Sequence, residues 1–166
     1  GAPDLDEAVL KRIHHILFKD VYEWAGETRK VALAKGKTVF APVRALHGYA
    51  DREILPRFRQ AAEQAGDDVQ LSDALSEAWG ELNALHPFRE GNGRTTQVFV
   101  TALAHRYDRD IDWRKISRTD ELAAAEAAMR FDYGGYTKLL TGAMRSWARG
   151  QAPKMLWPES GKTGKS

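Results

Sequence analysis

The chain has 166 residues and a net charge of +2, with 43% hydrophobic and 29% charged residues, which is ordinary for one soluble globular domain. It contains no cysteine, and this excludes a disulfide framework, a thiolate zinc site and a cysteine nucleophile and fits a reducing cytoplasm. No run approaches the ~20 apolar residues of a membrane span, and the small positive charge gives no reason to expect a membrane or nucleic acid as a partner.

Apolar residues at helical spacing predict a first helix over residues 5–17 and a second over residues 46–61, kinked or interrupted near Pro56. His14 and His15 of the first helix are expected to face solvent or the edge of the core, with no catalytic role. Between these helices, residues 28–33 and 38–40 are short β-prone runs around residues 34–37, and they predict a small hairpin.

The remaining elements are also helical. Residues 71–85 predict a helix capped by Ser72 or Asp73 that stops near His86, because Pro87 disfavours helical angles in the residue before it. Another helix should begin at Asn92 or Gly93. Later helices are predicted from Ser117 or Thr119 to Met129 and over residues 133–147. The expected fold is an all-α helical bundle with one short hairpin, formed by residues 1–150 and followed by a flexible tail over residues 151–166.

Residues 86–94 read His-Pro-Phe-Arg-Glu-Gly-Asn-Gly-Arg, and this run unites the groups that phosphate chemistry needs. His86 has an unperturbed pKa near neutrality, which suits a general base, and Glu90 offers the hard oxygen ligand that Mg²⁺ prefers. The turn of Gly91, Asn92 and Gly93 can bring backbone N–H groups to an anion at a helix N-terminus. Arg94 adds a donor fork for phosphate oxygens.

The same run also has simpler interpretations. A Gly-Asn-Gly sequence alone is usually only a turn, and a histidine beside proline is usually a helix-end residue. His86 and Glu90 have the spacing of a zinc pair, but Pro87 and Gly91 argue against one regular helix carrying both, and no third ligand is evident. The combination of all these groups in nine positions favours a phosphate site.

This run resembles the signature of the Fic domain family, His-x-Phe-x-(Asp/Glu)-Gly-Asn-Gly-Arg-x-x-Arg. The match is complete through Arg94 and fails at the last position, where the chain has Gln97. Residues 18–29, which contain Trp24-Ala25-Gly26-Glu27-Thr28-Arg29, resemble the segment that precedes the β-hairpin flap of the family. The resemblance covers roughly residues 5–148 and implies a Fic-like bundle, with the flap at about residues 28–41 beside the catalytic loop at 86–94.

The resemblance implies a transferase that moves AMP from ATP to a protein hydroxyl. His86 would accept the hydroxyl proton, and Glu90 would hold Mg²⁺. The N–H groups around Gly91, Asn92 and Gly93 would cradle the phosphates, and Arg94 would neutralise their charge. Such chemistry requires mostly positioning and charge stabilisation from the protein.

Two alternatives to AMP transfer remain open. One is transfer of another nucleotide or phosphate-containing group, and the other is a catalytically weak module that binds a nucleotide or a partner. Gln97 lies one helical turn after Arg94 on the same face and brings no charge to the distal phosphates. Nucleotide preference would then differ, unless Arg89 or another cation compensates.

The family is regulated by an inhibitory helix with the pattern (Ser/Thr)-x-x-x-Glu-(Gly/Asn). Residues 117–121 come nearest, but Leu122 follows Glu121. The resemblance therefore leaves three readings open: a separate antitoxin-like partner, a segment outside this sequence, or no inhibition. A toxin in the bacterial cytoplasm or an effector delivered into a host or target cell would fit.

The hairpin has a docking role in this interpretation. Lys35, Gly36, Lys37, Thr38 and Val39 form its centre. An exposed hairpin edge offers unpaired backbone groups and can bind an extended segment of a target protein by strand addition. A solvated basic turn is the simpler alternative.

Overall fold

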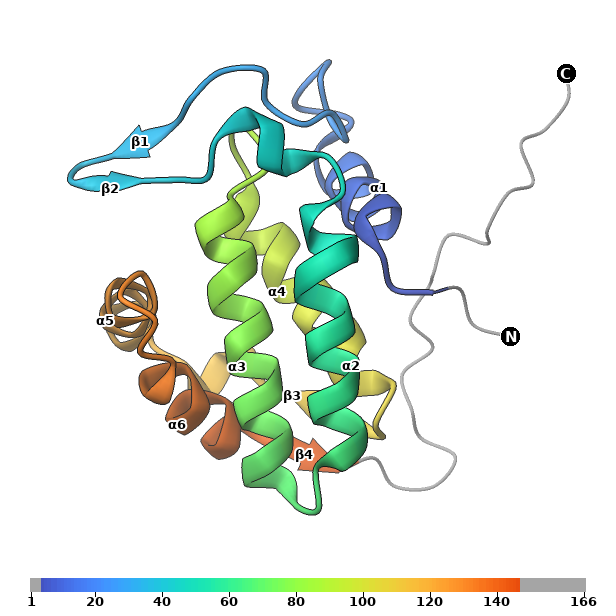
Figure 1. Ribbon diagram of the computed structural model, residues 1–166, viewed down its shortest axis with the longest axis vertical. Coiled ribbons are helices and arrows are strands. Elements are labelled where there is room, and N and C mark those ends of the chain that lie inside the picture. The colour runs from blue at the N-terminus through green and yellow to red at the C-terminus, as the bar shows by residue number, and fades with distance from the viewer. Residues whose placement is uncertain (1–3, 147–166) are drawn as a thin grey trace, which may run out of the picture.

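The structure is a computed structural model that describes residues 4–146. Its central element is α3 (Asp68–Leu85), which packs against α2 (Leu55–Gln64), α4 (Asn92–His105), α5 (Arg118–Ala128) and α6 (Gly134–Ala143) (Figure 1). Because α3 is covered on several sides, it buries apolar residues around much of its circumference, as a helix inside a bundle does. These include Leu71, Leu75, Ala78, Trp79, Leu82 and Leu85.

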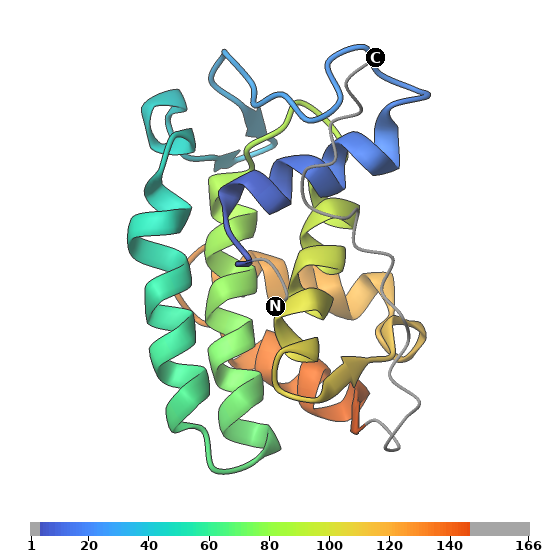
Figure 2. The same ribbon diagram turned by 90° about the vertical axis from the view of Figure 1, so that its right-hand side faces the viewer.

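One end of the bundle gathers the segments that matter for function. The α3–α4 loop, α1 (Glu7–Phe18) and the hairpin of β1 (Ala34–Lys35) and β2 (Thr38–Val39) all lie at this end (Figure 2). The hairpin pairs Ala34 with Val39 and Lys35 with Thr38. Two short helical turns, η1 (Val43–Leu46) and η2 (Ala50–Ile54), lead from the hairpin into α2.

The helical bundle with a short hairpin is confirmed, with differences at several element ends. The helix before the catalytic loop starts at Asp68 and is capped by Asp67, whose carboxylate accepts the Gln70 N–H at 2.8 Å. The proposed cap at Ser72 or Asp73 was wrong, because Ser72 lies fully buried inside the helix. The predicted interruption near Pro56 is confirmed, because the π-helical turn η2 ends at Ile54 and Pro56 lies in the first turn of α2.

Strand content differs from the prediction in two places. Residues 34–35, predicted as part of the turn, pair with β2, whereas the β-prone residues 28–33 form no strand. The last helix ends at Ala143, where Met144–Ser146 become β4 and pair with β3 (Arg109–Ile111). Arg145 explains the change, since its guanidinium contacts Asp110 at 2.7 Å and anchors β4 beside β3.

Two further findings concern the whole chain. The expected domain boundary at residue 150 and the tail over residues 151–166 lie outside the described residues. Within residues 4–146, none of the helices combines the length and the apolar character needed to cross a membrane.

Candidate active site

His86 occupies the end of α3 in a left-handed backbone conformation, with φ 47° and ψ 63°. Its N–H still bonds to the Leu82 carbonyl at 3.0 Å, so the chain turns away from the helix axis without losing this hydrogen bond. Pro87 prevents a further helical residue. The predicted end of the helix at His86 is confirmed, and the turn presents the imidazole at the end of the bundle.

The His86 ring is fixed in the state that a general base requires. Its Nδ1 lies 3.2 Å from the Asn83 carbonyl, and because a carbonyl can only accept, Nδ1 carries the proton and Nε2 keeps a free lone pair. The ring also stacks on Phe40 with centroids 3.8 Å apart. Burial, assisted by the charges of Arg29 and Lys35, lowers the pKa of His86 to about 4, so the imidazole is neutral at pH 7.

The Asn92 side chain closes the catalytic loop. Its Oδ1 accepts the Phe88 N–H at 2.9 Å, and its Nδ2 donates to the Phe88 carbonyl at 2.7 Å. Because both ends of the buried amide are used inside the loop, the side chain is unavailable for a phosphate. A phosphate-binding role predicted for Asn92 would therefore use its backbone N–H.

His14 supports the loop from beneath, and the sequence reading missed it. The expectation that His14 faces solvent or the core edge was wrong, because its side chain is fully buried and its ring stacks on Phe88 with centroids 3.9 Å apart. Nδ1 accepts the Gly26 N–H at 2.8 Å, so Nε2 carries the proton and donates to the Glu90 carbonyl at 2.9 Å. Burial lowers the pKa of His14. Its position four residues after Leu10, on the apolar face, was the available signal.

Arg29 fastens the hairpin to the catalytic loop and was also missed as a site residue. Its guanidinium is 1% exposed and donates to the carbonyls at the end of α3, Leu85 at 3.2 Å and His86 at 2.8 Å. It also donates to Val31 and Ala41, one on each limb of the hairpin. Burial lowers the pKa of this guanidinium, and the negative end of the α3 dipole favours its charge.

The start of α4 is a tight glycine turn. Gly91 has φ 82°, and a Cβ there would lie 2.4 Å from the Phe18 ring, so only glycine fits this approach. The first N–H of α4 with a backbone acceptor is that of Thr95, which bonds to the Gly91 carbonyl. The preceding N–H groups of Asn92, Gly93 and Arg94 have no acceptor within residues 4–146. Unpaired donors of this kind at a helix N-terminus attract phosphate.

The charged groups around this turn are exposed. Glu90 makes no ion pair within residues 4–146, and no group of three or more metal-ligating side chains occurs among them. A lone free carboxylate beside unpaired N–H groups fits Mg²⁺, which is usually held by one or two carboxylates plus substrate phosphates. Arg94 is also exposed, and its guanidinium lies 5.5 Å from the centroid of the Phe18 ring.

Gln97 is directed towards α5. Its amide Nε2 donates to the Glu121 carboxylate at 3.1 Å. Glu121 belongs to the sequence nearest the inhibitory pattern, and this stretch forms the first turn of α5, capped by Ser117. The guanidinium of Arg89, the cation that could compensate for Gln97, lies over Trp24, 5.0 Å from the ring centroid.

The five hairpin residues predicted to dock a target are mostly exposed. Lys35, Gly36, Lys37 and Val39 are exposed, Val39 by 74%, and Thr38 is half-buried. The Phe40 N–H bonds to the Leu33 carbonyl, and the alternation of an antiparallel pair therefore directs the N–H and C=O of Ala34 and Val39 outwards. Each strand presents one free edge position. The hairpin also reaches the base, since Phe40 stacks on His86.

Known proteins are similar to this chain in sequence and in fold. The model of the Fic/DOC family matches residues 4–104. The chain is 38% identical over 145 residues to the protein adenylyltransferase VbhT of Bartonella schoenbuchensis, covering 87% of this chain and 29% of that protein. It is 33% identical over 138 residues to a protein adenylyltransferase of Bartonella henselae, covering 74% and 25%. The chain thus spans less than a third of the length of either relative.

Solved structures agree on the fold. The N-terminal Fic domain of a VirB-translocated Bep effector protein from Bartonella quintana, with bound ADP, has a TM-score of 0.78 and 25% identity, and the match covers 89% of this chain and 77% of that one. BepC from Bartonella tribocorum, with bound AMPPNP, has a TM-score of 0.71 at 22% identity, covering 89% and 78%.

Proposed function

The chain belongs to the Fic/DOC family, and from this premise we propose that it transfers AMP from ATP to a hydroxyl side chain of a target protein. The observation that carries the proposal is the state of His86. A neutral imidazole with a free Nε2 stands at the end of α3, one short loop before the unpaired N–H groups of α4. A proton acceptor and an anion site are therefore neighbours.

The step follows from this arrangement. The target hydroxyl oxygen forms a bond to the α-phosphorus of ATP while its proton passes to Nε2 of His86. The bond from the α-phosphorus to the bridging oxygen breaks, and pyrophosphate leaves. The N–H groups of Asn92 and Gly93, with the Arg94 guanidinium, stabilise the phosphate charge.

Glu90 is the residue proposed to hold Mg²⁺. Its exposed carboxylate has no competing ion pair within residues 4–146. When bound, Mg²⁺ would neutralise charge on the phosphates and orient them for in-line displacement. Loop closure by His14 and Asn92 fixes the backbone on both sides of this carboxylate, so its position relative to the N–H groups is set by the fold.

Transfer of a different nucleotide is the second candidate, and Gln97 favours it. Where the family pattern has an arginine, this chain has a neutral amide bonded to Glu121. Binding of the distal phosphates would therefore rest on Arg94 and the backbone. Comparing ATP, UTP, GTP and CTP as donors, with wild type and Gln97→Arg, distinguishes the two, and no change in donor preference or affinity for the variant would remove Gln97 from this role.

Regulation by a separate partner is proposed for this chain. The sequence nearest the inhibitory pattern is fixed as the first turn of α5 and so is not free to act as an added helix. A partner that supplies such a helix should lower transfer when it is co-purified with the chain. Unchanged transfer in the presence of the product of the neighbouring gene would count against this proposal.

Mass spectrometry tests the main proposal. Lysate proteins incubated with the chain, ATP and Mg²⁺ should gain the mass of AMP on a tyrosine, serine or threonine. His86→Asn is the matched control, because asparagine tolerates the left-handed backbone of this position better than alanine does. A different added mass supports the second candidate, and no modification of any protein contradicts both.

A further inference from the structure

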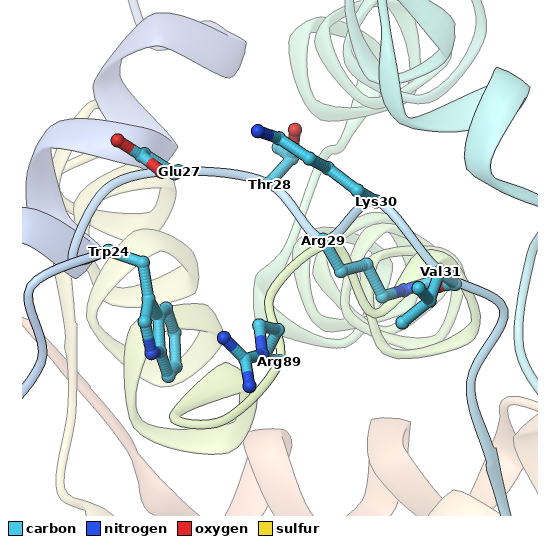
Figure 3. A pocket seen from close by; sticks show the side chains of 7 residues that line it. All are labelled: Trp24, Glu27, Thr28, Arg29, Lys30, Val31 and Arg89. Atoms are coloured by element: carbon cyan, nitrogen blue, oxygen red, sulfur yellow. The ribbon is translucent and has the colours of Figure 1, made fainter.

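A groove of about 270 Å³ opens beside the base of the hairpin (Figure 3). Trp24 and Arg89 form one side, and the consecutive residues from Glu27 to Val31 form the other. None of the predicted site residues lines it. Because Arg89 directly precedes Glu90 and residues 29–31 continue into the hairpin, the groove connects the catalytic loop to the proposed docking element. We refer to it as the Trp24 groove.

The floor of the Trp24 groove is held rigidly. The indole of Trp24 stacks on Tyr22, with centroids 4.3 Å apart and planes 13° from parallel. It also stacks on the buried His14 ring, 5.6 Å away. At the other end of the groove Val31 is 62% exposed. An aromatic surface that is fixed in advance binds a partner at a low entropic cost.

The lining of the groove carries more positive than negative charge. Arg89 and Lys30 are exposed and form no ion pair within residues 4–146. Glu27 is the single acidic residue of the lining. The Arg89 guanidinium lies 5.0 Å from the Trp24 centroid, which orients it while leaving N–H donors available. Arg29 contributes little, because its donors are used by backbone carbonyls.

The same charge continues along the hairpin. Lys35 and Lys37 are exposed beyond Lys30, and Val31 precedes the first paired residue, Ala34, by three positions. At ~3.3 Å per extended residue, this is a distance of roughly 10 Å. A target segment paired with the hairpin and continuing along its first limb would therefore reach the Trp24 groove within a few residues.

From this charge complementarity and this continuity we infer that the Trp24 groove binds an acidic side chain of the target protein, a few residues to one side of the modified hydroxyl. The inference deepens the proposed function and rests on it. Arg89 would be the specificity-determining residue, forming a charge-assisted hydrogen bond to the target carboxylate over the face of Trp24. Selection among hydroxyls would then depend on sequence context at a fixed offset.

A synthetic library of 15-residue peptides provides the test. Each peptide carries one central tyrosine, serine or threonine in an alanine, glycine and valine background, and one glutamate or lysine is placed at each position in turn. Wild type, Arg89→Glu and Lys138→Glu are incubated with the library, ATP and Mg²⁺, and the added mass of nucleotide is measured. Lys138 is exposed on α6 and gives the same change of charge at a site remote from the groove. ATP affinity is measured for each protein by titration calorimetry.

Wild type should modify peptides with glutamate at one offset about tenfold faster than peptides with lysine there. Arg89→Glu should reverse this preference with unchanged ATP affinity, and Lys138→Glu should behave as wild type. The inference is overturned, while the proposed function stands, if wild type shows no preference for peptides with glutamate. The same holds if Lys138→Glu reverses the preference as strongly as Arg89→Glu does. A loss of ATP affinity in Arg89→Glu would assign the groove to the nucleotide and also overturn it. If wild type modifies lysate proteins but no peptide, the target is not recognised as an extended segment, and the inference is overturned while the proposed function stands. If neither lysate proteins nor peptides are modified, the proposed function fails and the inference falls with it.

Discussion

The proposed catalytic loop and the proposed docking hairpin lie at the same end of the bundle but are built in opposite ways (Figure 2). Around the loop, buried polar side chains bond to the backbone: Asn92 bonds to Phe88 from within the loop, and His14 bonds to the Glu90 carbonyl from α1. The hairpin has two residues in each strand, and Val39 is 74% exposed. The loop needs one geometry for chemistry, whereas the hairpin keeps backbone groups free for a partner.

Arg29 is the junction between these two regions. Its guanidinium bonds to the end of α3 and to both limbs of the hairpin. The exposed hairpin is therefore attached at its base to the most rigid part of the site. A target paired with the hairpin would inherit a fixed position relative to His86, which is how positioning contributes to the rate of such a transfer.

Replacing the base should have the largest effect. His86→Asn is expected to lower transfer by ~10²–10⁴-fold, the usual contribution of a general base, with ATP affinity retained. Single-turnover transfer and calorimetric titration with ATP measure the two quantities. Transfer that survives at near wild-type rate would show that the proton leaves by another route.

Replacing Arg29 should have the next largest effect, which is a loss of stability. Arg29→Met removes the donor of four carbonyls, of which that of Leu85 is fully buried. It is expected to destabilise the chain by about 2 kcal/mol, since an unsatisfied buried acceptor costs roughly 1–3 kcal/mol. Urea unfolding measures the change. Arg44→Met, at an exposed arginine of η1, is the matched control and should change stability by less than about 0.5 kcal/mol. Equal stabilities of the two variants would mean that Arg29 is not a junction.

Two glycines of the loop should respond differently to the same added methyl group. In Gly91→Ala the added methyl group would lie 2.4 Å from the Phe18 ring, and alanine would have to adopt a φ of 82°. The variant should therefore unfold at a lower urea concentration than wild type. Gly93→Ala meets nothing within 4 Å and should leave stability intact. Because its methyl would stand at the proposed phosphate site, we expect about tenfold weaker ATP binding, or ~1.4 kcal/mol. Unchanged affinity would place the phosphates elsewhere.

Proline substitutions in the hairpin should lower transfer without changing the stability of the chain. Val39→Pro removes an outward N–H from β2 without breaking a bond of the hairpin, and transfer to a protein target should fall by about tenfold if that edge pairs with the target. Ala34→Pro makes the same change on β1, so the variant with the larger loss of transfer identifies the edge that pairs with the target. Transfer and ATP affinity are measured for both. An equal loss of ATP binding in Val39→Pro would argue against docking.

The pH dependence should show the smallest effect. Burial holds the pKa of His86 at about 4, so the acid limb of kcat/KM should lie well below pH 6.5. The sign for stability follows from the same shift: the folded state binds the proton less tightly than the unfolded state, so stability is full above pH 6.5 and falls as the pH drops towards 4. His86→Asn should lose less stability over this interval. An acid limb near 6.5 would show that His86 is solvated.

Local features of the sequence were sufficient to predict the helices and their main stops, and they place the residues proposed for phosphate chemistry in one loop. These features are local: Pro87 ends a helix whichever way it packs, apolar spacing marks a buried face, and the residues from His86 to Arg94 are adjacent in the chain. The predicted start of α4 at Asn92 is confirmed for the same reason. The roles of Glu90, Arg94 and the hairpin remain predictions.

Which distant residues support the loop depends on the tertiary structure. His14 and Glu90 are 76 residues apart, and Arg29 and His86 are 57 apart, so no local pattern indicates that they bond. The strand at Met144–Ser146 is stabilised by the ion pair between Arg145 and Asp110 of the neighbouring strand. Trp24 and Arg89 form a groove only after α1 and the loop have packed together. Burial and partner choice are properties of the packed chain, and they convert a recognisable motif into a neutral base on a fixed support.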